Sequence, residues 1–215
     1  MEVYRFSVHP DAVAGAFDWS ENKKKRRSKK GAVRWYPTDS DGFPLGPLPD
    51  DLKAKMATHW ALTGLGNDWL PDFFNSNGPH HFTGLQAVGE KLADIYRMRV
   101  GDDLELVPIP NFWSLADEAE IAEPYYLANV FASAETIDLA RSEVIEVKNP
   151  KLAGAQKYMS ASQSNKWVKN VRGFKTDLHV WRDANTSEWF CDEEFKAEMD
   201  AASPGNFMFL ETAEE

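Results

Sequence analysis

Cysteine and long apolar runs are the two features that this sequence most lacks. Cys191 is the only cysteine, so no disulfide can form within the chain, and a reducing compartment is the expected environment. No run approaches the ~18 apolar residues that a membrane-spanning helix needs. The N-terminal residues MEVYRFSVHP lack the basic and apolar regions of a secretory signal. We therefore expect a cytoplasmic protein that has no membrane partner.

Short catalytic and metal-binding motifs are missing as well. The chain has no glycine-rich phosphate loop, no GxSxG elbow and no HExxH string. His80 and His81 are adjacent, and adjacent strand residues point to opposite faces, so a shared metal ion with Asp68 or Asp72 is not favoured. Cys191 has no nucleophile signature around it and is predicted to be a packed core thiol. The sequence thus predicts no cofactor, no metal and no catalytic residue.

The composition favours a folded α+β domain. The 215 residues are 43% hydrophobic and include 8 Trp and 13 Phe, enough for a substantial core. Strands are predicted at residues 3–8, 104–109 and 207–210. Helices are predicted from Asp50 or Asp51 to Leu62, from Thr83 onward, and from an N-capping Asp192 to Ala202. We expect one domain with a mixed or mainly antiparallel sheet and a few helices packed on one side.

Four further segments have local predictions. Residues 68–74 contain Pro71 and are predicted as an edge strand or a loop. Residues 112–123 are predicted as an acidic connector anchored by Trp113 and Leu115. Residues 125–131 and 144–147, joined by a polar step, are predicted to form the middle of the sheet. Strands or their approaches are expected at residues 167–174 and 177–181, followed by a turn from Asp183.

Charge is unevenly distributed along the chain. The net charge is −10, yet residues 23–30 (KKKRRSKK) hold seven of the 24 basic residues, which leaves 17 basic against 34 acidic residues elsewhere. Residues 102–123 contain seven acids and no Lys or Arg, and residues 183–215 contain ten acids against Lys196 alone. An acidic body repels phosphate backbones, so nucleic acid is a poor partner and a basic protein a better one. The basic run is predicted to be an exposed loop in preference to a nucleic-acid arm, and its role stays open.

Several spaced elements of the second half resemble a known family. The segments YYLANVF and IDLARSEV are followed by GFKTDLHVW and by a strand, helix, glycine and strand over residues 192–210. This order resembles a bacterial immunity-protein family that accompanies polymorphic toxins and type VI secretion effectors, typified by a myxobacterial member. Residues 61–215 carry the resemblance, loosely over 68–110, whereas residues 1–60, with the basic loop, carry little of it. The matching motif residues are Tyr125, Tyr126, Asn129, Asp138, Ser142 and Glu143.

The resemblance implies a protein that binds and occludes a cognate toxin and catalyses nothing. The acidic stretches would steer a basic toxin, such as a nuclease, and exposed aromatic residues would anchor it. The candidate toxin-binding residues are the acids of those stretches: Asp102, Asp103, Glu105, Asp117, Glu118, Glu120, Asp192, Glu193, Glu194, Glu198 and Asp200.

Two alternatives remain at this stage. Asp138, Glu146 and Lys148 resemble the D…ExK arrangement of restriction-like nucleases, in which two carboxylates hold Mg²⁺ and the lysine positions the attacking water. That string is short and common, and Asp138 is more simply explained as a turn residue bonded near Ser142. The second alternative is a non-catalytic adaptor. The nuclease predicts that the three side chains converge, and the immunity protein predicts that they do not.

Overall fold

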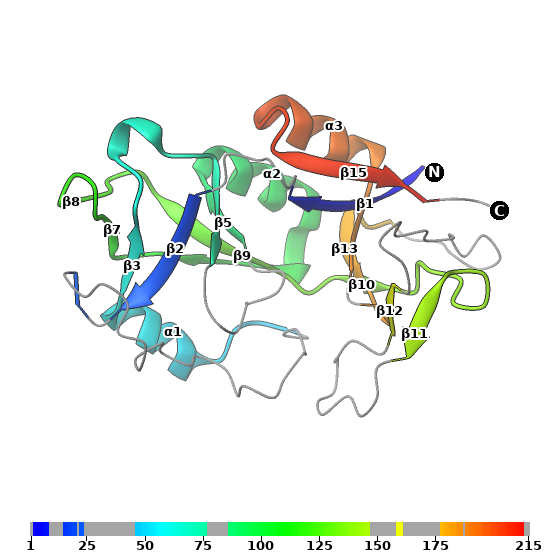
Figure 1. The fold of residues 1–215 in the computed structure, drawn as a ribbon. Helices are drawn as coiled ribbons and strands as arrows, with labels where there is room; N and C mark the ends of the chain where they lie inside the picture. The colour runs from blue at the N-terminus through cyan, green and yellow to red at the C-terminus, as the bar shows by residue number, and fades with distance from the viewer. Residues whose placement is uncertain are drawn as a thin grey trace.

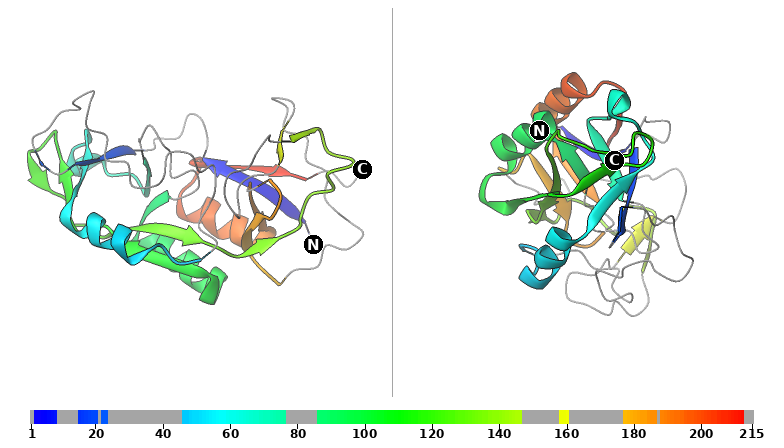
Figure 2. Two further views of the ribbon diagram at one scale, coloured as in Figure 1. Left: turned by 90° about the horizontal axis from the view of Figure 1, so that it is seen from below. Right: turned by 90° about the vertical axis from the view of Figure 1, so that its left-hand side faces the viewer.

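In the computed structural model, the described residues are 2–8, 15–20, 22–23, 46–76, 86–146, 158–160, 177–186 and 188–212. They form three sheets and three α-helices, in an elongated arrangement (Figures 1 and 2). The predicted α+β class, with mixed and mainly antiparallel pairing, is confirmed. His80, His81, Lys148, residues 24–30 and residues 167–174 lie outside the described residues.

A five-stranded sheet joins the two ends of the chain. Its strand order is β10-β13-β14-β1-β15, and only the short β10–β13 pair is parallel. The first strand therefore lies between two of the last, with Tyr4 opposite Cys191 on one side and Glu211 on the other. The strands are β1 (Val3–Val8), β10 (Ser133–Ala134), β13 (Val180–Asp183), β14 (Trp189–Asp192) and β15 (Phe207–Glu211).

An eight-stranded sheet holds most of the first half of the chain. Its order is β6-β9-β5-β4-β2-β3-β7-β8, with parallel pairs β2–β4 and β3–β7. Its strands are β2 (Gly15–Ser20), β3 (Trp60–Thr63), β4 (Phe73–Ser76), β5 (Gln86–Gly89), β6 (Leu104–Pro108), β7 (Phe112–Ser114), β8 (Ala119–Glu120) and β9 (Tyr125–Val130). A separate two-stranded sheet pairs β11 (Val144–Glu146) with β12 (Tyr158–Ser160).

The helices cover both faces of the eight-stranded sheet. Successive residues of β4, Phe73 and Phe74, are fully buried in two different apolar clusters, as expected for a strand covered on both sides. The helices are α1 (Asp50–Thr58), α2 (Glu90–Val100) and α3 (Glu193–Ala202). Helices α2 and α3 join the first cluster, whereas Met56 of α1 joins the second. The expectation that all helices lie on one side is therefore wrong.

The third helix forms as the sequence predicts. The Asp192 Oδ1 atom accepts a hydrogen bond from the Phe195 N–H at 2.9 Å, which satisfies one of the free donors of the first turn. Phe195, Met199 and Ala202 form the buried stripe, and β15 follows. The predicted helix is therefore confirmed. It could be predicted because its cap and its apolar stripe are both local in sequence.

Two other helix predictions are wrong at one end. Residues 86–89 form β5 and not the start of a helix, because they pair with both β4 and β9, and α2 begins only at Glu90. The first helix ends at Thr58, and Trp60–Thr63 pair with β2 and β7 as β3. In both segments, pairing with distant strands overrides an apolar spacing that also fits a helix.

Sheet positions also differ from the predictions. Strand β4 lies inside the sheet, since Pro71 precedes it by two residues and removes no donor from the ladder. The predicted connector at 112–123 contains β7 and β8, and Leu115 is 39% exposed and anchors nothing in the core. Strand β9 does lie within the large sheet, but β11 does not, and its Ile145 is 52% exposed.

A buried carboxylate fixes the turn after β13. The Asp183 Oδ2 atom accepts from the N–H groups of Thr136 and Ile137, at 2.7 and 3.1 Å. Its Oδ1 atom accepts from the N–H groups of Asn185 and Thr186 and from the Thr186 hydroxyl. The predicted turn at Asp183 is confirmed. None of the helices in the described part of the chain has the length and apolar character to cross a bilayer.

Candidate partner-binding surface

One end of the molecule combines exposed apolar and acidic side chains. It is built from the 3₁₀ turn η1 (Asn67–Trp69) and from the turn that joins β7 to β8. We call this surface the acidic tip and define it by Trp69, Leu115, Asp68, Asp117, Glu118 and Glu120.

Hydrogen bonds hold the two segments of the acidic tip together. The Leu115 N–H donates to the Thr63 carbonyl at 2.8 Å, and the Ser114 hydroxyl donates to the Leu65 carbonyl at 2.7 Å. The Asp117 carboxylate accepts from the Asn67 N–H and faces Gly66, where a Cβ atom would lie 3.0 Å from Asp117 Oδ1. The segments are about 50 residues apart in sequence, so their joining depends on the β3–β7 pairing.

The apolar side chains of the acidic tip are unusually exposed. Trp69 is 78% exposed, and Leu115, on the bonded hairpin turn, is 39% exposed. An exposed tryptophan leaves a large apolar area in water, and burying such a side chain under a partner is favourable by roughly 1.5–3 kcal/mol. Large exposed apolar groups with a polar rim are typical of protein interaction sites. The sequence predicts only an edge strand or a loop at residues 68–74, so it does not single out Trp69 as an exposed anchor.

The acidic side chains of the tip lie on the same two joined segments as these apolar groups. Asp68, Asp117, Glu118 and Glu120 are all exposed. Glu118 has φ 52°, a left-handed conformation that few residues other than glycine adopt, and it lies in the turn between β7 and β8. The tip therefore exposes four carboxylates and two apolar side chains.

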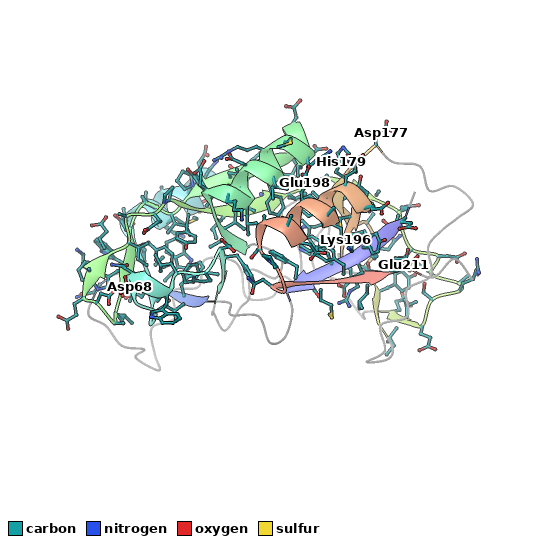
Figure 3. The ribbon with its side chains drawn as sticks, turned by 90° about the horizontal axis from the view of Figure 1, so that it is seen from above. Asp68, Asp177, His179, Lys196, Glu198 and Glu211 are labelled. Carbon is teal, nitrogen blue, oxygen red and sulfur yellow. The ribbon has the colours of Figure 1, made fainter. Side chains whose placement is uncertain are left out.

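The other predicted acidic residues lie elsewhere and are partly neutralised. Figure 3 shows Asp68 far from Glu198 and Glu211, at the opposite end of the molecule. Arg99 pairs with Glu194 and Glu198, and Lys196 pairs with Asp200 at 3.2 Å. The Arg99 guanidinium lowers the pKa of Glu198 by hydrogen bonding to it. The three remaining acids of this end, Asp102, Asp103 and Glu193, are exposed.

Two predicted toxin-binding acids have structural contacts instead of an open surface. Glu105 accepts hydrogen bonds from the Leu48 N–H and from the Lys53 ammonium group, the latter at 3.0 Å. Asp192 is only 7% exposed, caps α3 and bonds the His179 ring at 2.6 Å. Both carboxylates hold elements of the fold in place. The acids of the sequence prediction therefore divide between two surfaces and the interior.

The aromatic and amide residues of the family motif are packed within the fold. Tyr125 is buried, donates its hydroxyl to the Pro71 carbonyl at 2.7 Å, and has a pKa that burial raises. A hydrogen bond with Glu90 raises the pKa of Tyr126, whose ring lies 5.0 Å from the Arg97 guanidinium. Asn129 is fully buried and donates to the Gly46 carbonyl at 3.0 Å. These side chains connect β9 to segments far away in sequence.

The remaining motif residues form a turn. The Asp138 carbonyl accepts from the Ser142 N–H at 2.9 Å, and its Oδ1 atom accepts from the Ala140 N–H at 3.0 Å. Glu143 is exposed just before β11. The Asp138 carboxylate thus stabilises the turn, as the simpler interpretation predicts.

Comparison with known protein families shows which family part of the chain resembles. Residues 112–214 match the immunity protein family Imm11. The predicted resemblance to an immunity-protein family is confirmed, and the match supports a toxin-neutralising function. No curated protein matches the chain.

The Imm11 match begins with β7 and includes every strand of the five-stranded sheet except β1. It also contains the hairpin turn of the acidic tip, whereas η1 with Trp69 precedes it. The tip therefore joins an Imm11-matching segment to the region before it.

Two of the three residues of the nuclease alternative, Asp138 and Glu146, lie in the described part of the chain, and Lys148 lies outside it. Glu146 is exposed on β11, and the Asp138 carboxylate is engaged in its own turn. In the part of the chain that the structure describes, no three His, Cys, Asp or Glu side chains gather in a way that could hold a metal ion.

Proposed function

We propose that this protein is a cytoplasmic immunity protein that neutralises a cognate toxin by covering it with the acidic tip. The toxin is a basic secreted effector, such as a nuclease of the polymorphic or type VI class. The observation that carries the proposal is Trp69, which is 78% exposed on a hydrogen-bonded turn next to Asp68 and joined to the turn of Asp117. The Imm11 match supports the same function.

The chemistry of the acidic tip fits an inhibitory interface. Binding energy in protein interfaces is concentrated in a few buried aromatic or large side chains, and charged rims speed the encounter with an oppositely charged partner. Trp69 and Leu115 would supply the large side chains that become buried, and Asp68, Asp117 and Glu118 would supply the charged rim. Inhibition by occlusion of the toxin requires no catalytic group in the inhibitor.

The first test is functional. The product of the adjacent gene is expressed alone and together with this protein, growth is followed, and the two proteins are then co-purified. We expect that product to be toxic alone, harmless in the presence of this protein, and recovered in a complex. If the product of the adjacent gene is harmless alone, or stays toxic when this protein is co-expressed, the result would contradict the immunity function.

The second test addresses the surface. The Trp69→Ala and Leu115→Ala variants should each weaken toxin binding, and the tryptophan change should raise Kd at least about 30-fold, since interface hot spots contribute ~2 kcal/mol or more. Binding is measured by calorimetry, and folding is checked by circular dichroism.

Met98→Ala is the matched control for the surface test. Met98 is 68% exposed on α2, away from the tip, so its removal tests whether any exposed apolar side chain has the same effect. Equal affinities for the wild type and the Trp69→Ala variant would show that the toxin binds elsewhere.

A further inference from the structure

Two tryptophans of the eight-stranded sheet hold a lysine of the same chain between them. The Lys23 Nζ atom lies 4.0 Å from the centroid of the Trp60 ring and 4.2 Å from that of Trp113. The two rings are 5.9 Å apart and meet edge to face at 84°. An ammonium group over an aromatic face is attracted by the negative potential of the ring, and tryptophan gives the strongest such contact. We call the Trp60–Trp113 pair the tryptophan clamp.

The strands fix the geometry of the tryptophan clamp. In the β3–β7 pair, Leu62 lies opposite Trp113, and Trp60 is two residues before Leu62, so both indoles project from one face of the sheet. Both are only partly buried, which leaves their rings accessible to a cation. The clamp is therefore built by the sheet and not by the lysine that occupies it.

Lys23 reaches the clamp from the end of β2. Ser20 lies opposite Trp60, and its hydroxyl donates to the Asn22 carbonyl at 2.9 Å, which turns the chain toward the indoles. Lys23 is the first residue of the cationic sequence KKKRRSKK. The chain thus places one of its own ammonium groups in an aromatic site that accepts a cation.

The clamp lies next to the acidic tip. Glu120, one of the exposed tip carboxylates, is opposite Trp113 in the β7–β8 pair and shares its face. The hairpin that carries Trp113 also carries Leu115 and Glu118. A cation bound between the indoles would therefore be within the same interface as the tip anchors.

We propose that the tryptophan clamp binds a lysine or arginine side chain of the toxin, and that Lys23 occupies the clamp until that side chain displaces it. This inference rests on the proposed function, because it takes the partner to be a basic protein. The carboxylate of Glu120 adds to the attraction for the incoming cation. Lys23 acts as an internal competitor. The apparent affinity for the toxin is the intrinsic affinity multiplied by the fraction of molecules in which Lys23 has left the clamp.

The decisive experiment compares toxin affinities in a double-mutant cycle. Lys23→Gln keeps a polar but shorter side chain and removes the charge, and it should tighten toxin binding by about 2- to 30-fold, the range expected for one cation–π contact. Trp113→Leu keeps an apolar side chain and should weaken binding by a similar factor. In the double variant, the gain from Lys23→Gln should disappear.

A second measurement needs no toxin. Tetralysine is titrated into the wild type and the Lys23→Gln variant, and the indole N–H resonances of Trp60 and Trp113 are followed by NMR. We expect saturable shifts in the variant at a Kd about 2- to 30-fold lower than in the wild type, and none at Trp60 after Trp113→Leu. If these shifts occur but no toxin is neutralised, the proposed function fails while the cation site stands.

Several outcomes would contradict the proposal that the clamp is a displaceable cation site. Unchanged or weaker toxin binding in Lys23→Gln, with the protein folded, would show that Lys23 only fastens β2 to the sheet. Equal tetralysine affinities in the wild type and Lys23→Gln, or shifts that persist without Trp113, would overturn the clamp as a displaceable cation site. Toxin neutralisation with unchanged binding in every clamp variant would leave the immunity function intact and reject the clamp alone.

Discussion

Asp183 shows how a single side chain can connect distant parts of this chain. Asp183 is 1% exposed, and five hydrogen bonds from two segments end on its two carboxylate oxygens. Three of them come from its own turn, and two come from residues 46 and 47 positions earlier. The sequence predicts the turn, because Asp, Asn and Thr bond to their own backbone. It does not predict the long-range pair, which depends on the β10–β13 contact.

Removing this carboxylate should be costly. Asp183→Ala leaves four N–H groups without this acceptor, three of them buried, so we expect the free energy of unfolding to fall by about 3 kcal/mol or more. Urea unfolding followed by tryptophan fluorescence measures the loss. The exposed Asp177→Ala is the control and should change stability by less than about 0.5 kcal/mol. Similar stabilities for the two variants would mean that the Asp183 bonds contribute little.

Cys191 is a second residue whose behaviour follows from burial. It is 0% exposed on β14, next to β1, and burial raises the pKa of its thiol well above the usual range. The thiolate is the reactive form, so native protein at pH 8 should react with a disulfide reagent only through unfolding. We expect the labelling rate to rise steeply with urea across the unfolding transition. Rapid labelling without urea would contradict the buried placement.

Among the elements, α2 and α3 are held side by side by charged as well as apolar contacts (Figure 1). Arg99, in the last turn of α2, bonds Glu198 through two nitrogens and Glu194 through a third. Arg99 is about one-fifth exposed and Glu198 about one-third, so water screens the pair only in part. The helix α3 itself was predictable from its cap and stripe. Its contact with α2 was not, because about 95 residues separate the partners.

The Arg99 contact should depend on pH. The hydrogen bond from Arg99 lowers the pKa of Glu198 in the folded state, so its stabilisation is complete above the unfolded pKa and is lost as the pH falls through the folded one. Arg99→Gln should reduce the free energy of unfolding by about 0.5–1 kcal/mol at pH 7. The difference from the wild type should vanish in acid below the folded pKa.

Urea unfolding at decreasing pH measures this difference. Lys55→Gln, which removes an exposed cation from α1, is the control and should show no such pH-dependent difference. A deficit of Arg99→Gln that persists unchanged into acid would mean that the arginine stabilises the helices through its apolar stem.

At the scale of the whole molecule, the acids that the sequence groups as toxin-binding candidates do not lie on one surface: Figure 3 shows Asp68 far from Glu198. The sequence predicted acidic stretches but not their placement, because the two halves of the tip are brought together by strand pairing. At the α3 end, Arg99 and Lys196 neutralise several carboxylates. At the tip, Asp68, Asp117, Glu118 and Glu120 are exposed on the same two segments as Trp69 and Leu115. The tip is therefore the end that should steer a basic partner.

Electrostatic steering predicts a salt-dependent association rate. Neutralising the tip with Asp68→Asn and Glu118→Gln should lower the association rate constant for the toxin several-fold at low salt, with a smaller change in dissociation. The difference from the wild type should shrink at about 0.5 M NaCl, where screening is strong. Surface plasmon resonance measures both rates.

The matched double neutralisation, Asp102→Asn with Glu193→Gln, removes two exposed carboxylates from the other end. It should leave the association rate close to that of the wild type. A larger effect there than at the tip would move the encounter surface to the α3 end.

The position of β1 between β14 and β15 has a consequence for biosynthesis. The ribosome makes Val3–Val8 long before its two neighbouring strands, which come from residues 189–211. At about 5–20 residues per second, a nascent β1 waits roughly 10–40 s before it can pair. During that time its apolar side chains, Val3 and Phe6, lack the two strands that cover them in the folded sheet, so chaperone capture of this segment would protect the chain until residues 189–211 have emerged.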